Sequence, residues 1–155
     1  IVRRLLQLEM VVAATPDYWS EHGRPKHPRE LLDHRVLAMA AQGQPPHWRF
    51  SVDGKPLDLP LQPLFTATDS APLVPLALTG LGVIRGSRML LRDWIELEEL
   101  EPLFGEYSPR DLWLYVAYTQ RRHNSAALNA LLEYLESAIP RYQEKPAGAQ
   151  ASFLA

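Results

Sequence analysis

The chain has 155 residues, of which 46% are hydrophobic and 22% charged, and it contains no cysteine. This composition is ordinary for a folded domain, and it excludes disulfides, thiolate catalysis and cysteine-based metal sites. Sixteen basic against eighteen acidic residues give a net charge of −2, which argues against a nucleic-acid-binding surface because phosphate recognition needs clustered Lys and Arg.

The chain opens with I-V-R-R-L-L, without Met and already inside what reads as a strand. We therefore expect a fragment whose upstream part is missing. No apolar run approaches the roughly 20 residues of a membrane span, and no signal peptide opens the chain. Together with the absence of cysteine, which suits a reducing cytosol, these features predict a cytoplasmic protein.

A buried strand is predicted first, at Met10–Ala14, because this short apolar run is rich in β-branched residues. Thr15 follows as an N-cap, and Pro16 comes directly after it, so a helix is predicted to begin there. Gly23 is predicted to end it. A second short helix is expected from Pro28 to about His34. Residues 35–40 are then a candidate strand.

A β-hairpin is predicted after the Gly- and Pro-containing loop at residues 42–46. His47–Val52 alternates apolar and polar residues, Asp53-Gly54 is a dipeptide that two-residue hairpin turns favour, and alternation resumes at Leu57. Leu64–Ala67 is expected to continue as another strand.

The stretch L-T-G-L-G-V at residues 78–83 has the G-x-G spacing found in phosphate-binding loops. In that fingerprint the glycines follow a strand and open a helix. Here a polar cap and an apolar helical run precede them, and V-I, which reads as a strand, follows. We therefore predict that Gly80 and Gly82 close a helix that begins at Asp69-Ser70, and that their role is structural.

Strand and helix signals continue beyond this point. Met89–Trp94 is predicted to be a short helix or a turn, and the glutamate-rich segment after it is expected to turn its leucines inward, at Leu97, Leu100 and Leu103. Asp111–Thr119 has almost no polar interior, so we expect a strand that is buried on both faces.

A long amphipathic helix is predicted next. Ser125 can cap it, and its apolar residues recur at the spacing of one helical face, at Leu128, Leu131, Leu132, Leu135 and Ile139. The helix is expected to end before Pro140, and residues 140–155 to form a disordered tail. Strands and helices alternate over most of the length, which predicts an α/β fold with a largely central sheet.

Residue types that carry catalysis or bind metals are scattered. The five histidines lack metal-ligand spacing and are interpreted as surface or capping residues: His22, His27, His34, His47 and His123. Ser87 lacks the flanking pattern of a nucleophilic serine, and the glutamates between Glu96 and Glu101 are interpreted as a solvated face. We therefore expect no enzyme, no metal and no cofactor.

A ligand site is predicted where a strand ends and a helix begins, at Thr68, Asp69 and Ser70. In α/β sheets ligands gather outside the carboxyl ends of strands, and helix N-termini attract anions. Asp69 would itself repel an anion, so Thr68, Ser70 and backbone N–H groups are the expected donors; a purely capping role is the alternative. Arg85, just after the predicted V-I strand, is either a partner for a ligand carboxylate or a surface charge.

Four stretches of the chain form an ordered set. A-A-T-P-D-Y-W-S-E-H-G-R-P-K-H-P-R-E-L-L-D-H is followed by W-R-F-S-V-D-G, then by A-L-T-G-L-G-V, and finally by L-W-L-Y-V-A-Y-T-Q-R-R-H-N-S-A-A-L-N-A-L-L-E-Y-L. In this order and spacing, from the first residue to about Ile139, the set resembles the effector-binding domain of LysR-type transcriptional regulators. No single stretch is specific to that family, but the ordered set is.

The resemblance implies an α/β fold like that of periplasmic binding proteins, with two subdomains around a cleft that binds a small, often anionic effector. Residues 1–9 would be the remnant of a hinge strand and residues 10–110 the second subdomain. Residues 111–139 would return to the first subdomain, and residues 140–155 would be the tail.

The resemblance also implies partners. DNA would be bound only through an N-terminal winged helix-turn-helix domain that this chain lacks. The effector would contact Thr68, Asp69 and Ser70, which align with the second-subdomain part of the cleft. The helix of Tyr18 and Trp19 aligns with one used in antiparallel dimers, so we expect a homodimer or tetramer and no membrane partner.

Two departures from the family pattern leave the effector's identity open. Arg85-Gly86-Ser87 stands where the family usually has a proline, and Thr-Asp stands in place of the usual Asn or Ser before the ligand-side helix. W-R-F with R-R-H-N-S resembles a subgroup that often senses aromatic or other carboxylic acids. The alternative function is a periplasmic-type solute-binding receptor of the same fold, which an upstream secretion signal would favour. An α/β enzyme with its catalytic residues upstream is a third possibility.

Overall fold

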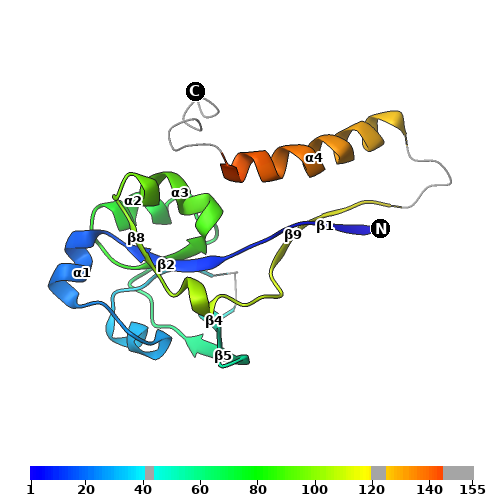
Figure 1. The fold of residues 1–155 in the computed structure, drawn as a ribbon. Helices are drawn as coiled ribbons and strands as arrows, with labels where there is room; N and C mark the ends of the chain where they lie inside the picture. The colour runs from blue at the N-terminus through cyan, green and yellow to red at the C-terminus, as the bar shows by residue number, and fades with distance from the viewer. Residues whose placement is uncertain (41–43, 120–124, 145–155) are drawn as a thin grey trace. The chain divides into compact units, whose positions relative to one another are not determined.

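The computed structural model of the protein describes residues 1–40, 44–119 and 125–144 (Figure 1). The chain divides into two compact units. Unit 1 consists of Ile1–Leu8 and Arg110–Ala155, and unit 2 consists of Glu9–Pro109. None of the helices in the described ranges is long and apolar enough to cross a membrane.

Unit 1 contains an antiparallel pair of strands, β1 (Val2–Gln7) and β9 (Trp113–Ala117). The prediction of a strand at β9 is confirmed, but its expected burial on both faces is wrong, because Tyr115 is 60% exposed. A strand is buried on both faces only when other elements cover each side. In the described part of unit 1, a single helix packs against this pair.

That helix is α4 (Ala126–Glu144), which packs against β1. Its predicted cap is confirmed, because the Ser125 hydroxyl accepts a hydrogen bond of 3.2 Å from the amide of Leu128. The predicted end before Pro140 is wrong, since the helix continues to Glu144. A proline inside a helix removes one backbone donor, which weakens the helix without having to end it. The rest of the expected tail, residues 145–155, lies outside the described residues.

Unit 2 is built around a sheet whose central strand is the one expected from the sequence, β2 (Met10–Ala14). It pairs in antiparallel fashion with β7 (Ile84–Ser87) on one side and with β8 (Glu101–Leu103) on the other. All four residues from Val11 to Ala14 have no exposed surface. The strand is therefore covered on both faces.

Two further strands extend the sheet beyond β7. β3 (Leu37–Met39) and β6 (Phe65–Ala67) pair in parallel, and a parallel bridge between Val36 and Val83 joins them to β7. Because β3, β6 and β7 run in the same direction, their carboxyl ends lie at one edge of the sheet, which we call the carboxyl edge.

Different elements cover the two faces of this sheet. Alternate residues of β2 point to opposite sides, so Val12 and Ala14 belong to one core cluster and Val11 and Ala13 to another. The hairpin face carries α1 (Pro16–His22), the 3-10 helix η1 (Pro28–Asp33) and the hairpin of β4 (His47–Val52) and β5 (Lys55–Pro60). The helix face carries α2 (Leu73–Leu78) and α3 (Arg88–Glu96).

The signals at both ends of α1 are confirmed. The Thr15 hydroxyl accepts a hydrogen bond of 3.2 Å from the amide of Tyr18, and the helix ends at Gly23, whose φ is 83°. The left-handed half of backbone space suits glycine, which has no Cβ to clash there. Tyr18 and Trp19 on the inner side of α1 are 2% and 1% exposed.

The predicted hairpin is also confirmed. Val52 of β4 pairs with Lys55 of β5, and the two turn residues have positive φ, 52° at Asp53 and 73° at Gly54. Both central positions of this turn type need positive φ, which is why Asp-Gly favours it. The inward residues of the hairpin are buried: Trp48, Phe50 and Leu59.

The start of α2 differs from the prediction. The helix begins at Leu73 and not at Asp69-Ser70, and its cap position, Pro72, offers no side-chain hydrogen bond. The Asp69 carboxylate instead accepts a hydrogen bond of 2.7 Å from the amide of Ala71, which closes a turn two residues on. The expected end of the helix is confirmed, since Gly80 adopts a φ of 76° directly after it and β7 follows.

Candidate functional site

The carboxyl edge of unit 2 is where the fold offers a site. Ligands of open α/β sheets gather outside the carboxyl ends of the strands. Residues 68–70 leave this edge after β6, and Arg88 begins α3 directly after β7. Strand order therefore brings together segments that are far apart in the sequence.

The 68–70 loop presents two hydroxyl groups. Thr68 is exposed and Ser70 partly buried, and neither hydroxyl has a hydrogen-bond partner among the described residues. The carboxylate of Asp69 is occupied by the amide of Ala71, and the carbonyl of Ser70 accepts a hydrogen bond of 3.0 Å from the amide of Leu73. Because α2 starts only at Leu73, the predicted anion-attracting helix end does not coincide with this loop.

The sequence predicted that Arg85 comes just after a strand. In the structure Arg85 lies within that strand, β7. Its Nη2 donates a hydrogen bond of 2.6 Å to the carbonyl of Arg49, and the centre of its guanidinium lies 5.2 Å from the ring centroid of Phe50. Its Nε is buried and has no hydrogen-bond partner among the described residues. Burial lowers the pKa of Arg85 to about 10, and no carboxylate in the described ranges forms an ion pair with it.

The pairing register relates Arg85 to the 68–70 loop. Arg85 pairs with Val12, which belongs to the hairpin-face core. Val83 lies two residues before Arg85 and forms a bridge with Val36. Val36 lies two residues before Ala38, which pairs with Thr66. Thr66 and Arg85 therefore belong to strands that are separated by β3. Thr68 follows Thr66 at the carboxyl edge, and within the described residues no contact joins it to Arg85.

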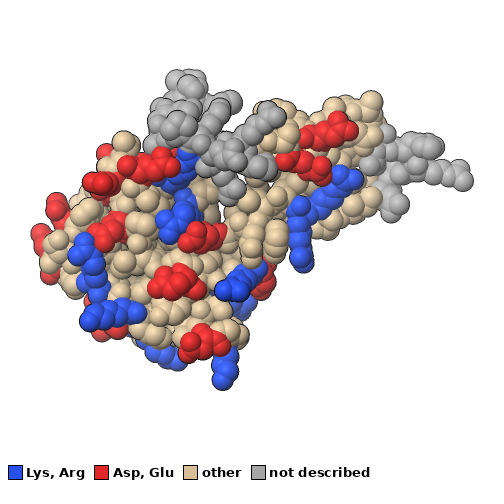
Figure 2. Space-filling model, viewed as in Figure 1, with Lys and Arg blue, Asp and Glu red and all other residues tan. Residues whose placement is uncertain are grey.

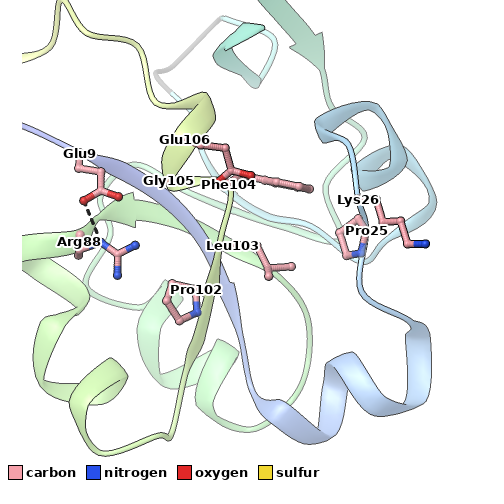
Figure 3. A pocket seen from close by; sticks show the side chains of 9 residues that line it. All are labelled: Glu9, Pro25, Lys26, Arg88, Pro102, Leu103, Phe104, Gly105 and Glu106. Carbon is pink, nitrogen blue, oxygen red and sulfur yellow. Dashed lines mark hydrogen bonds and ion pairs between the residues drawn. The ribbon is translucent and has the colours of Figure 1, made fainter.

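A pocket of about 460 Å³ lies beside this edge, where the chain enters unit 2 (Figure 3). Its charged wall is an ion pair in which Arg88 Nε lies 2.9 Å from Glu9 Oε2, and the Arg88 amide also donates to the Glu9 carbonyl at 2.8 Å. A Cβ at Gly105 would overlap the Glu9 carboxylate, so a larger residue there would displace the flexible end of the Glu9 side chain. Leu103 and Phe104 supply apolar lining.

Sequence reasoning missed Glu9 and Arg88. The signal nearest to them was R-G-S-R-M, which drew attention to Ser87 as a nucleophile. The Ser87 hydroxyl is the N-cap of α3 and accepts a hydrogen bond of 3.2 Å from the amide of Leu90. Charged side chains of both signs are interspersed over the visible face of unit 2 (Figure 2), so on that face a ligand would be recognised by individual side chains.

The helix predicted to take part in self-association, α1, carries Tyr18 and Trp19 on its inner side. Because Tyr18 and Trp19 are almost fully buried in the hairpin-face core, their side chains cannot meet a partner. The exposed residues of α1 are Asp17, Ser20 and Glu21, together with His22 at its end. Use of this helix in self-association stays a prediction, with its outer face as the surface concerned.

Comparison with known proteins gives a consistent result. The family model described as "LysR substrate binding domain" matches residues 1–140. The uncharacterized HTH-type transcriptional regulator YcaN of Escherichia coli (strain K12) is 27% identical over 131 residues, which cover 84% of this chain and 42% of YcaN. The chain thus spans less than half the length of that regulator.

Solved structures agree at the level of the fold. The regulatory domain of CrgA, a LysR-type transcriptional regulator from Neisseria meningitidis, superposes with a TM-score of 0.71 at 27% identity, covering 89% of this chain and 68% of that one. The full-length Vibrio cholerae virulence activator AphB superposes with a TM-score of 0.72 at 20% identity, covering 89% of this chain and 47% of AphB.

Proposed function

The chain belongs to the LysR substrate-binding domain family, and from that premise we propose that it senses a small anionic effector, most simply a carboxylate, at the carboxyl edge of unit 2. The whole protein is then a cytoplasmic transcriptional regulator that binds DNA through a separate helix-turn-helix domain and assembles into oligomers. The proposal assigns no catalytic residue. Because the matched relatives are transcriptional regulators, a sensor is favoured over a solute-binding receptor.

The observation that carries the effector class is the guanidinium of Arg85. Among the described residues, one carbonyl and one aromatic ring contact this half-buried cation. It therefore lacks, in that part of the chain, the counter-charge that buried charges ordinarily have. A carboxylate bound beside it would supply that charge and a charge-assisted hydrogen bond. The same anion would gain donors from Thr68 and Ser70, while Asp69 would act by holding the turn at Ala71.

The double substitution Thr68→Ala and Ser70→Ala tests the loop. We expect it to abolish the response of the full-length protein to its effector while basal DNA binding remains, because each lost hydrogen bond to a charged group weakens binding by roughly tenfold or more. The effector is first found by thermal-shift screening of carboxylic acids, since a ligand that binds the folded state raises the melting temperature.

The control for the loop is the pair Thr79→Ala and Ser137→Ala, which removes two hydroxyls that bond to helix carbonyls and do not belong to the 68–70 loop. This pair is expected to keep the full response. An unchanged response of the Thr68 and Ser70 variant to the true effector would exclude the loop as the site.

The substitution Arg85→Met tests the effector class. We expect it to weaken carboxylate binding roughly 100-fold or more, because a bound anion would be left without its cation. The stability of the ligand-free protein should change by no more than about 1 kcal/mol, since an unpaired, partly buried charge contributes little to folding. Isothermal titration gives the first value and urea unfolding the second.

The matched control for Arg85 is Arg49→Met. It removes a neighbouring cation that pairs with Asp58 but keeps the Arg49 backbone carbonyl that Arg85 bonds. Binding in this variant should stay within about twofold of the wild type, because a surface ion pair contributes at most about 1 kcal/mol. Equal losses in the two variants would mean that general charge, and not Arg85, attracts the ligand.

A further inference from the structure

A cluster of aromatic rings joins α1 to η1 on the hairpin face. The rings of Tyr18 and His22 stack with centroids 4.3 Å apart, and the His34 ring meets the Trp19 ring edge-on at 5.5 Å. His34 Nδ1 lies 3.3 Å from the Tyr18 hydroxyl oxygen. His34 is partly buried and lies directly after η1, so it contacts the rings of α1 from the end of η1.

The Arg35 amide favours one direction for the Tyr18–His34 hydrogen bond, from the hydroxyl to the ring nitrogen. The backbone amide of Arg35 donates to the Tyr18 hydroxyl oxygen at 3.0 Å, so the hydroxyl's own hydrogen is free to be donated. The nearest acceptor is Nδ1 of His34, and this nitrogen can accept only when it carries no proton. With the Tyr18 hydroxyl as the donor, the contact requires neutral His34 with its hydrogen on Nε2.

The groups around His34 do not favour its charged form. Burial, followed by the neighbouring His22, lowers the pKa of His34, while Asp33 and Glu30 oppose the shift more weakly. Tyr18 offers no negative charge near neutral pH, because burial raises the pKa of its hydroxyl. A proton on His34 would convert Nδ1 into a donor and leave the Tyr18 hydrogen without this acceptor.

We propose that the Tyr18–His34 hydrogen bond is a pH-sensitive contact that holds α1 against η1 at neutral pH and releases it in acid. This goes beyond effector sensing, because the contact responds to protons alone and lies on α1 and η1 and not in the 68–70 loop. Release would alter the outer face of α1, at Asp17, Ser20 and Glu21. Any assembly that uses this helix would therefore depend on pH.

The sign of the effect follows from the lowered pKa. In the unfolded chain His34 has an ordinary pKa of 6.5, and in the folded chain it binds its proton only at lower pH. Between these two pKa values the unfolded state thus holds more protons than the folded state. The stabilisation by the Tyr18–His34 contact is therefore complete above about pH 6.5 and is lost as the pH falls through the folded-state pKa.

The test compares His34→Asn with the wild type in the full-length protein. Asparagine places an oxygen near the position of Nδ1, so it keeps the acceptor and cannot titrate. Between about pH 7.5 and pH 5 we expect amide-exchange protection of α1, corrected for intrinsic rates, to fall in the wild type and to stay level in the variant. His47→Asn, which removes an exposed histidine on the hairpin, should behave like the wild type.

A second measurement guards against a variant that folds poorly. Nitrogen-15 NMR of the wild type at neutral pH should show His34 with Nδ1 unprotonated and Nε2 protonated. A proton on Nδ1 at neutral pH, or an acid-induced loss in His34→Asn equal to that of the wild type, would overturn the proposal.

Discussion

Replacement of Gly82 by alanine is expected to destabilise the chain by about 3 kcal/mol or more, since overpacking against a rigid backbone is among the most costly single changes. A Cβ at Gly82 would overlap the carbonyl oxygen of Arg35 and lie 3.1 Å from its carbon. That oxygen accepts a hydrogen bond of 2.8 Å from the amide of Val83. The clash would therefore separate β3 from β7, where the two parts of the unit 2 sheet join.

The control for Gly82 is its neighbour in the G-x-G stretch. Gly80 has a φ of 76°, and a Cβ there would lie 3.7 Å from the Thr15 hydroxyl, an ordinary contact. Gly80→Ala should therefore cost only the backbone strain of a left-handed alanine, about 1–2 kcal/mol. Urea unfolding measures the free energy of unfolding of both variants. Equal losses of stability would mean that the close approach of Gly82 to the Arg35 carbonyl does not constrain the fold.

Gly80 and Gly82 show which structural roles can be predicted from the sequence alone. Their place between a helix and a strand was predictable, because that order is written in neighbouring residues. Their separate roles were not. Gly80 supplies a backbone angle, which is a local property, whereas Gly82 makes room for Arg35, a residue 47 positions earlier that no local pattern connects to it.

The same distinction explains which elements were predicted correctly. The hairpin and α1 carry their signals within a few residues, as Asp53-Gly54 and Thr15, and both have the expected bounds. The start of α2 failed because Asp69 has two local uses, and it closes a turn with Ala71 instead of capping a helix. Leu97 was expected inward and is 61% exposed, since α3 ends there and Glu98 takes a positive φ of 59°.

The residues of the candidate site show the same difference between local signals and contacts that are distant in the sequence. Strand order was enough to direct attention to residues 68–70, because the carboxyl edge of an α/β sheet is a general location for ligands. The contact of Arg85 with the Arg49 carbonyl spans 36 positions, and the Glu9–Arg88 pair spans 79. Contacts of this kind depend on sheet register and on which face a side chain takes, and a single sequence contains neither.

Replacement of Trp19 by alanine is expected to cost about 3–5 kcal/mol, the loss typical of a large aromatic residue removed from a core. Trp19 is 1% exposed, and its indole Nε1 donates a hydrogen bond of 3.1 Å to the carbonyl of Glu101. It therefore attaches α1 to β8 by packing and by a directed bond. Trp19→Phe should lose less, about 1–3 kcal/mol, because the ring remains while the Glu101 carbonyl loses its donor.

The exposed Leu97 provides the control for Trp19. Leu97→Ala should change the free energy of unfolding by no more than about 0.5 kcal/mol, as surface substitutions usually do. All three variants are best unfolded with urea near pH 7.5, above the range in which His34 titrates, so that His34 is neutral throughout and its protonation does not change the measured free energies. A Trp19→Ala loss no larger than that of Leu97→Ala would mean that α1 is not docked through this residue.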